Sequence, residues 1–218
     1  MACSACWRWG WVEVFFWQHA RCAGLELVEV RLNPSAAEVA RSHGFEVMTD
    51  PLPLGVLRDR LRASQCDVIC SFQLLEHPSD PISFLHDATP LLRPNGVLIL
   101  SVPNADVAYT LDPLRDLDLL DQPPHHMGHW SFALFRYLPI LLPLQLEILA
   151  YEPLASQHVV CFVAAWCRQR RASIPKAMVR LLLNCYSQSL LRGMLHLGFR
   201  RFVRGHTLMV RFRKPLVE

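Results

Sequence analysis

Three histidines lie close together in the segment QPPHHMGHWS (Gln122–Ser131). They are His125, His126 and His129, and Trp130 follows them directly. Imidazole titrates near neutral pH, so one of these side chains could take a proton from a hydroxyl, an amine or a carbon acid. A histidine-rich lid held in place by its own hydrogen bonds is the alternative interpretation.

A second pair of polar side chains, Glu76 and His77, follows the apolar run CDVICSF (Cys66–Phe72). This carboxylate and imidazole could contact a ligand. A Glu-His pair between a strand and a helix can also cap or orient the loop through local hydrogen bonds. Both interpretations remain open.

The eight cysteines are scattered along a chain of 218 residues that is large enough to bury a core without disulfides, and we find no signal peptide. We therefore expect reduced thiols and a cytoplasmic protein. Cys3 and Cys6 form a C-x-x-C pair, but no second pair of ligands lies at a zinc-finger spacing. Cys66 and Cys70 flank an apolar strand, so no metal site is predicted.

The elements that must position these residues alternate between strands and helices. Asn33, Pro34 and Gly44 have the residue types of a helix N-cap, first turn and C-terminal cap, and an apolar strand precedes them. Cys66–Phe72 is a continuous apolar run, typical of a strand buried on both faces of a parallel sheet. This alternation predicts an α/β fold with a mostly parallel sheet and helices on both faces.

The pattern continues beyond residue 80. Asp80 and Pro81 predict another helix start, and Val97–Val102 reads as the next buried strand. Further apolar segments predict three more strands and one helix: strands Leu144–Tyr151, Val159–Trp166 and Thr207–Phe212, and helix Lys176–Leu197. No apolar segment is long and uninterrupted enough to predict a transmembrane helix.

Charge divides the chain unevenly. Twelve Lys and Arg and a single acid lie from residue 168 to residue 218, a net charge of +11, whereas residues 1–167 carry −8. We assign residues 1–167 to an α/β domain and residues 168–218 to a basic helical segment plus a closing strand of the same domain. The basic part predicts an anionic partner such as a phosphate-bearing substrate, a nucleic acid or a membrane surface. A solvated, arginine-rich helical face is the alternative.

Three segments together resemble the class I S-adenosylmethionine-dependent methyltransferases, in particular a branch with an LEH signature. They are VEVRLNPSAAEVARSHGFEV, CDVICSFQLLEHPSDPISFL and LLRPNGVLILSVPN. The resemblance implies a Rossmann-like fold, S-adenosylmethionine as cofactor, and methyl transfer to a small-molecule or lipid-like acceptor. It also implies that the residues at the end of the fourth strand, Phe72, Gln73 and Glu76, lie beside the cofactor, and that the histidine segment faces the acceptor.

The expected cofactor loop departs from the family pattern. The segment WRWGWVEVFF stands in the place of the glycine-rich loop, and only Gly10 remains as a glycine. Bulky or charged residues occupy the usual glycine positions: Trp9, Trp11 and Glu13. Arg31, followed by Leu32, stands where the family has an acid that accepts bonds from the ribose hydroxyls. Arginine is a donor only, so the resemblance implies weakened cofactor binding at Gly10, Arg31 and Leu32.

The strand that should precede this loop is predicted to be nearly missing, because only Met1–Cys6 remain for it. Three hypotheses follow from the sequence. The chain is a methyltransferase with His125 or His126 as general base, a non-catalytic relative that binds a partner through its basic part, or a truncated chain without a complete cofactor site.

Overall fold

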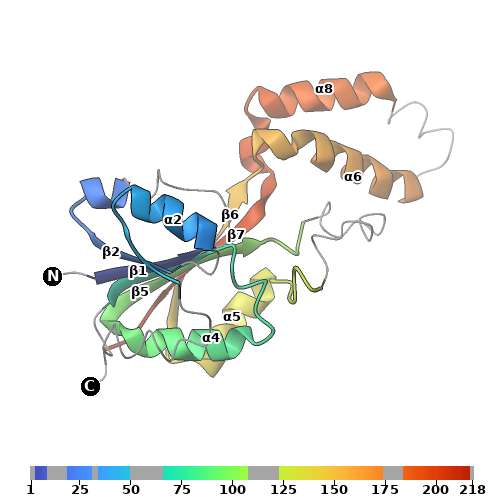
Figure 1. Ribbon diagram of the computed structural model, residues 1–218. Helices are drawn as coiled ribbons and strands as arrows, with labels where there is room; N and C mark the ends of the chain where they lie inside the picture. The colour runs from blue at the N-terminus through green and yellow to red at the C-terminus, as the bar shows by residue number, and fades with distance from the viewer. Residues whose placement is uncertain are drawn as a thin grey trace.

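The protein is described here by a computed structural model that covers residues 3–8, 19–30, 34–49, 66–107, 123–173 and 184–216. Within these ranges a seven-stranded sheet has the order β3-β2-β1-β4-β5-β7-β6 (Figure 1). Its strands are β1 (Cys3–Arg8), β2 (Glu26–Val30), β3 (Glu46–Met48), β4 (Cys66–Phe72), β5 (Leu92–Pro103), β6 (Gln145–Pro153) and β7 (Arg204–Arg213).

The first five strands of this order are parallel to one another. β4 and β5 pair in parallel with Ile69 opposite Leu98, as the two apolar runs predicted. β7 pairs antiparallel with both β5 and β6. The predicted α/β fold with a mostly parallel sheet is therefore confirmed, together with the strands expected at Leu144–Tyr151 and Thr207–Phe212.

The first strand is present, contrary to the expectation that it is nearly missing. β1 lies inside the sheet and pairs in parallel with β2 on one side and β4 on the other. The sequence analysis placed Trp7 and Arg8 in the expected cofactor loop. In the structure both residues belong to β1 and pair with Ser71 and Phe72 of β4.

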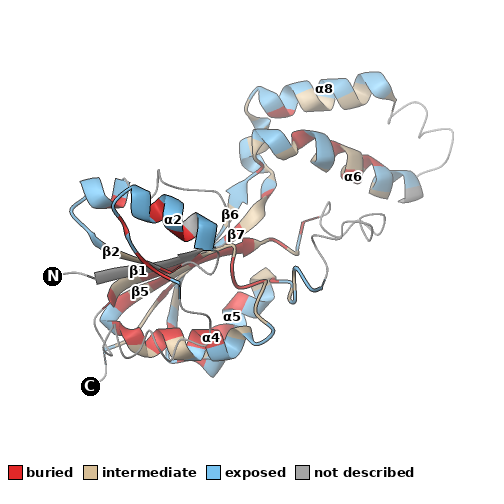
Figure 2. Cartoon of the chain, viewed as in Figure 1, coloured by how far each residue is buried: buried red, intermediate tan, exposed pale blue. Residues whose placement is uncertain are grey.

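Helices cover both faces of the sheet, as predicted. α2 (Pro34–Ser42) lies on one face, and α4 (Pro81–Ala88) and α5 (Phe132–Leu141) lie on the other (Figure 1). Figure 2 shows that the buried residues of these helices face the strands. Ala37 and Ala40 pack with Cys70 in a small core on the α2 side, whereas Leu85 and Phe135 belong to the larger core on the other side.

Several predicted turn and cap residues have the expected geometry. The Asp80 side chain accepts a hydrogen bond from the Ser83 backbone N–H at 3.0 Å and so caps α4. Gly44 has φ +78° after α2, and Asn95 has φ +64° in the segment RPNG, a conformation that asparagine tolerates better than most residues. The predicted N-cap Asn33 lies outside the described residues.

A pair of helices is inserted between β6 and β7, and here one prediction was wrong. Val159–Trp166, expected to be a strand, belongs to helix α6 (Val159–Ser173). The predicted boundary between residues 167 and 168 falls within this helix. Of the helix expected at Lys176–Leu197, the structure describes only α8 (Cys185–His196), because residues 174–183 lie outside the described ranges.

Helices α6 and α8 lie side by side and project away from the sheet (Figure 1). Val159, Val163 and Leu195 form a small core of their own with Leu154. We call residues 156–203 the helical hairpin; it includes the short 3-10 helix η5 (Phe199–Phe202) after α8. In the described part of the chain, no helix has the length and apolar character needed to cross a membrane.

Candidate active site

The carboxyl ends of the parallel strands define where a ligand is expected to bind. The strand order reverses between β1 and β4, and ligands of open α/β sheets bind beyond the strand ends at such a point. The residues that follow β1 and β2 lie outside the described ranges. They include six positions named above: Trp9, Gly10, Trp11, Glu13, Arg31 and Leu32.

The end of β4 is described and has an unusual backbone. Gln73 has φ +48°, a left-handed conformation that is uncommon for a residue other than glycine. Its backbone N–H donates to the Ser101 carbonyl of β5 at 2.8 Å, and its Nε2 lies 3.5 Å from the Ser101 hydroxyl. Phe72, directly before it, is half-buried and packs on the α2 side of the sheet. The turn at Gln73 thus ends β4 next to β5.

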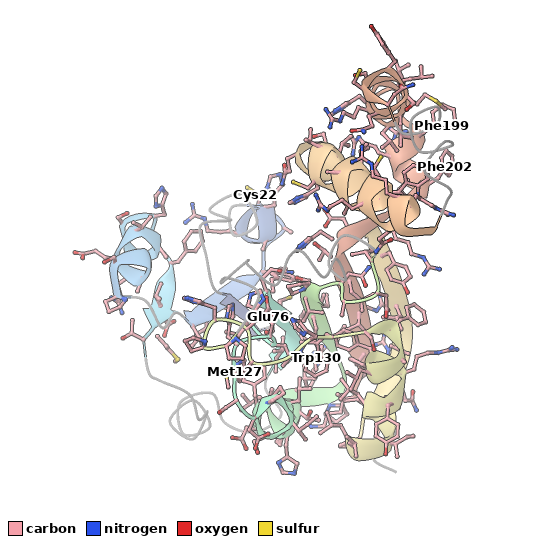
Figure 3. The ribbon with its side chains drawn as sticks, turned by 90° about the vertical axis from the view of Figure 1, so that its right-hand side faces the viewer. Cys22, Glu76, Met127, Trp130, Phe199 and Phe202 are labelled. Carbon is pink, nitrogen blue, oxygen red and sulfur yellow. The ribbon has the colours of Figure 1, made fainter. Side chains whose placement is uncertain are left out.

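Glu76 connects this loop to the histidine segment. It is 2% exposed, and its backbone carbonyl accepts hydrogen bonds from the N–H groups of Met127, at 2.7 Å, and Gly128, at 3.2 Å. Figure 3 shows Glu76, Met127 and Trp130 gathered in the same region over the sheet. The position of the histidine segment therefore depends on the conformation of the loop after β4.

His77 makes a second connection through its side chain. Its Nδ1 lies 2.6 Å from the His125 carbonyl, and because a carbonyl only accepts, Nδ1 carries the proton. The Nε2 atom of the same ring lies 4.0 Å from Oε1 of Glu76. The ring also meets the His126 ring edge to face, with centroids 5.0 Å apart.

Burial lowers the pKa of His77 below its usual value. The hydrogen bond to the His125 carbonyl raises this pKa in part, and nearby His126 and His125 lower it further. The His77 ring is therefore neutral at neutral pH. A neutral His77 ring in a fixed orientation can pack against the His126 ring without adding a positive charge beside it.

Trp130 fixes the other end of the histidine segment. Its indole Nε1 donates to the Leu75 carbonyl at 3.1 Å, its ring stacks on Phe135 at 5.1 Å, and its backbone carbonyl accepts from Ala105 after β5. Asn104 forms an isolated parallel bridge with Trp130. The segment is thus held between the loops that follow β4 and β5.

Of the predicted site residues, the structure brings Glu76 and His126 together, with His77 between them. His125 contributes its backbone carbonyl, and both His125 and His129 are exposed. The sequence analysis named His77 as a possible ligand contact or loop-orienting residue, and named Trp130 for its place beside the histidines, but it predicted neither of the contacts described above. Residue type and position in the sequence do not reveal contacts between segments that are far apart in the chain.

The same cluster has the composition of a metal site. One ligand atom each from Glu76, His77 and His126 lies within 4.8 Å of the others, although no metal site was predicted from the sequence. Carboxylate and imidazole are common zinc ligands. The three side chains can therefore either take up a proton or bind a metal ion.

The strand end also offers a polar atom to a bound cofactor. The Ser71 hydroxyl, one residue before the end of β4, is buried and has no hydrogen-bond partner among the described residues. An unpaired hydroxyl in this position is compatible with a ligand that has hydrogen-bonding groups, such as an adenosine.

The fold is the Rossmann-like fold of the solved methyltransferases compared below. The family described as "Methyltransferase domain" matches residues 9–142, more than half of the chain, and the chain belongs to this family of class I S-adenosylmethionine-dependent methyltransferases. S-adenosylmethionine is the cofactor that the family indicates.

Two curated relatives are similar over a shorter stretch. Both are ubiquinone biosynthesis O-methyltransferases, one from Haemophilus ducreyi, 30% identical over 97 residues, and one from Histophilus somni, 33% identical over 88 residues. These matches cover 41% and 37% of this chain, and the same shares of the relatives. The matched part therefore spans about two fifths of the length of these relatives.

Solved structures support the fold over nearly the whole chain. A SAM-dependent methyltransferase from Archaeoglobus fulgidus has a TM-score of 0.60 at 11% identity, covering 98% of this chain and 86% of its own. Coclaurine N-methyltransferase, bound to N-methylheliamine and S-adenosylhomocysteine, has a TM-score of 0.57 at 17% identity, covering 96% of this chain and 67% of its own. At these identities the likeness concerns the fold alone.

Proposed function

We propose that the protein transfers a methyl group from S-adenosylmethionine to a hydroxyl oxygen of a small-molecule or lipid-like acceptor, with His126 as the general base. The observation that carries this proposal is the attachment of the histidine segment, through His77 and Glu76, to the loop after β4. In this family the fourth strand ends beside the cofactor, so His126 would lie near the methyl group to be transferred.

S-adenosylmethionine, when bound, supplies a methyl carbon on a positively charged sulfur. The acceptor oxygen would bond to this carbon as the carbon–sulfur bond breaks, with S-adenosylhomocysteine as the leaving product. The hydroxyl proton moves to the His126 imidazole, which later releases it to water. Phe72 and Gln73 would contact the adenosine, together with Gly10, Arg31 and Leu32, which lie outside the described ranges.

His77 and Glu76 act as positioning residues in this proposal. His77 donates its Nδ1 proton to the His125 carbonyl and packs against the His126 ring, so it limits the orientations available to the base. The lowered pKa of His77 keeps the ring neutral, which avoids repulsion when His126 takes the proton. The general base His126 is therefore already in position before the molecule to be methylated binds.

The hydroxyl acceptor is supported by the relatives, which are O-methyltransferases of ubiquinone biosynthesis. A hydroxyl loses its proton on methylation and therefore requires a base. We expect an acceptor with a phenolic hydroxyl and an apolar tail, and a tailed catechol serves as the probe.

The test measures formation of S-adenosylhomocysteine and methylated product by mass spectrometry, with the wild-type chain, the tailed catechol and S-adenosylmethionine. We expect product formation, a fall of about a hundredfold in kcat for His126→Ala, and a much smaller change for His129→Ala as the matched control. The assignment is wrong if His126→Ala retains wild-type kcat or if the folded wild-type chain methylates neither this nor a tail-free catechol.

A second candidate is a methyltransferase-like protein that binds a partner without catalysis. The specific observation in its favour is the altered cofactor loop, with Trp9, Trp11 and Glu13 in glycine positions and Arg31 in place of an acid. Titration with S-adenosylmethionine separates the two candidates, because only the enzyme must bind it.

A further inference from the structure

The helical hairpin exposes large apolar side chains. Tyr186, Leu190 and Leu197 are 83%, 68% and 86% exposed, and their spacing places them on one side of α8 and its C-cap, Leu197. Phe199 and Phe202 follow in η5, where residues three apart share a side, and Phe202 is 88% exposed. We call these five residues the apolar patch. Figure 3 shows Phe199 and Phe202 on the hairpin, apart from Glu76 and Trp130.

The fold of the hairpin does not explain the patch. α8 already buries another side, because Leu195 is buried and Leu191 packs with it against the core that includes Val163 of α6. The residues of the apolar patch thus contribute little to that core. Neighbouring exposed apolar side chains of this size usually mark a binding surface.

Charge identifies the kind of partner. No Asp or Glu lies between Glu152 and Glu218, whereas this stretch contains twelve Lys and Arg. Within the described part of the hairpin, four arginines are exposed: Arg168, Arg170, Arg171 and Arg201. A second copy of the hairpin would bring the same positive charge to the contact and be repelled. Nucleic acid phosphates would pair with the arginines but offer little to Leu190 and Leu197.

An anionic bilayer presents anionic headgroups to the arginines and an apolar interior to the apolar patch. We propose that the helical hairpin docks the protein onto an anionic lipid surface, with the apolar patch inserted at the level of the headgroups and the arginines paired with lipid phosphates. This inference does not rest on methyl transfer, since it concerns a surface separate from the His77–His126 cluster.

The experiment measures binding of the full chain to sedimented vesicles. One set is phosphatidylcholine alone, and the other contains about one third phosphatidylglycerol. We expect binding to the anionic vesicles, much weaker binding to phosphatidylcholine, and loss of binding at high salt. The double variant Leu197→Ser/Phe202→Ser should bind about tenfold or more weakly, and Arg171→Gln/Arg201→Gln should also bind more weakly.

Matched controls lie on the body of the protein. Ile140 of α5 is 72% exposed, and Arg136 is exposed on the same helix, so Ile140→Ser and Arg136→Gln remove a similar side chain and a similar charge elsewhere. Both should bind as the wild type does, with thermal unfolding confirming that every variant folds.

Absence of binding to the anionic vesicles overturns the proposal, as does equal binding by Leu197→Ser/Phe202→Ser and Ile140→Ser. If the protein does not bind vesicles but forms a dimer that the patch variants dissociate, the surface is a dimer interface instead. If it does not bind vesicles but binds RNA and the patch variants abolish this binding, the surface is an RNA-binding site instead.

Discussion

The imidazole Nδ1 of His77 donates to the backbone carbonyl of His125 at 2.6 Å, across 48 residues of sequence. This single bond sets the tautomer of His77 and joins the loop after β4 to the histidine segment. It makes His77 the residue through which the geometry of the candidate site can be tested without touching the proposed base.

Replacing His77 should therefore weaken the fold measurably. His77→Ala removes a half-buried imidazole together with its hydrogen bond and leaves the His125 carbonyl with one partner fewer, so we expect a loss of about 1–2 kcal/mol in the free energy of unfolding, measured in urea. His77→Asn can place an amide N–H near the Nδ1 position and should recover part of the loss.

The matched control for this change is His43. Its Nδ1 also lies within hydrogen-bond distance of a carbonyl, that of Val39 at 2.8 Å, but in an exposed position after α2. His43→Ala should cost about 0.5 kcal/mol or less. Equal losses for the two alanine variants would contradict a structural role for the His77 bond.

Stability should also depend on pH through His77. Burial lowers its pKa in the folded state below the usual value of 6.5, so the unfolded chain binds more protons between the two values. The stabilisation by neutral His77 is present above pH 6.5 and is lost as the pH falls from 6.5 through the lowered folded pKa. Urea unfolding of the wild type and His77→Asn between about pH 8 and pH 5 checks this; identical pH profiles would contradict it.

Trp130 offers an independent test of how the histidine segment is held. Trp130→Phe keeps an aromatic ring beside Phe135 but removes the bond from Nε1 to the Leu75 carbonyl. We expect a loss of about 1–3 kcal/mol in unfolding free energy and a lower kcat, because a buried carbonyl loses its partner and the base becomes less well positioned. An unchanged kcat would show that the base does not depend on this anchor.

The metal-like geometry of Glu76, His77 and His126 leads to another prediction. If the cluster holds a proton, prolonged dialysis against EDTA should leave methyl transfer unchanged, and added Zn²⁺ should inhibit by occupying the same ligand atoms. Loss of activity in EDTA that is restored by Zn²⁺ or Mg²⁺ would assign the cluster to a metal instead.

Most of the sheet could be predicted because its signals are local. The apolar run of β4, the cap at Asp80 and the turn at Asn95 each depend on neighbouring residues. The run Val159–Trp166 was misread because β-branched and aromatic residues follow one another with little periodicity, which favours a strand. In the structure Val159 and Val163 lie four residues apart on the buried side of a helix that packs against α8.

The site was predicted less completely, for a physical reason. The residue types indicated proton chemistry at His126 and a ligand contact at Glu76, but the contact between the two segments depends on the positions of β4 and β5 in the folded sheet. The role of Trp130 arises in the same way, since its partner Leu75 lies 55 residues away. The spacing of residues along the chain does not show which distant residues lie close together in the fold.

The central claim is that this fold binds S-adenosylmethionine at the strand ends and that the altered loop weakens this binding, and calorimetric titration tests it most directly. The wild-type chain should bind S-adenosylmethionine and S-adenosylhomocysteine saturably but more weakly than micromolar. A variant with Gly at positions 9, 11 and 13 and with Arg31→Glu should bind about a hundredfold or more tightly, since two charge-assisted hydrogen bonds of about 1.5–3 kcal/mol each become possible. Micromolar binding by the wild type, or no gain in a restored variant that circular dichroism shows to be folded, would contradict the account.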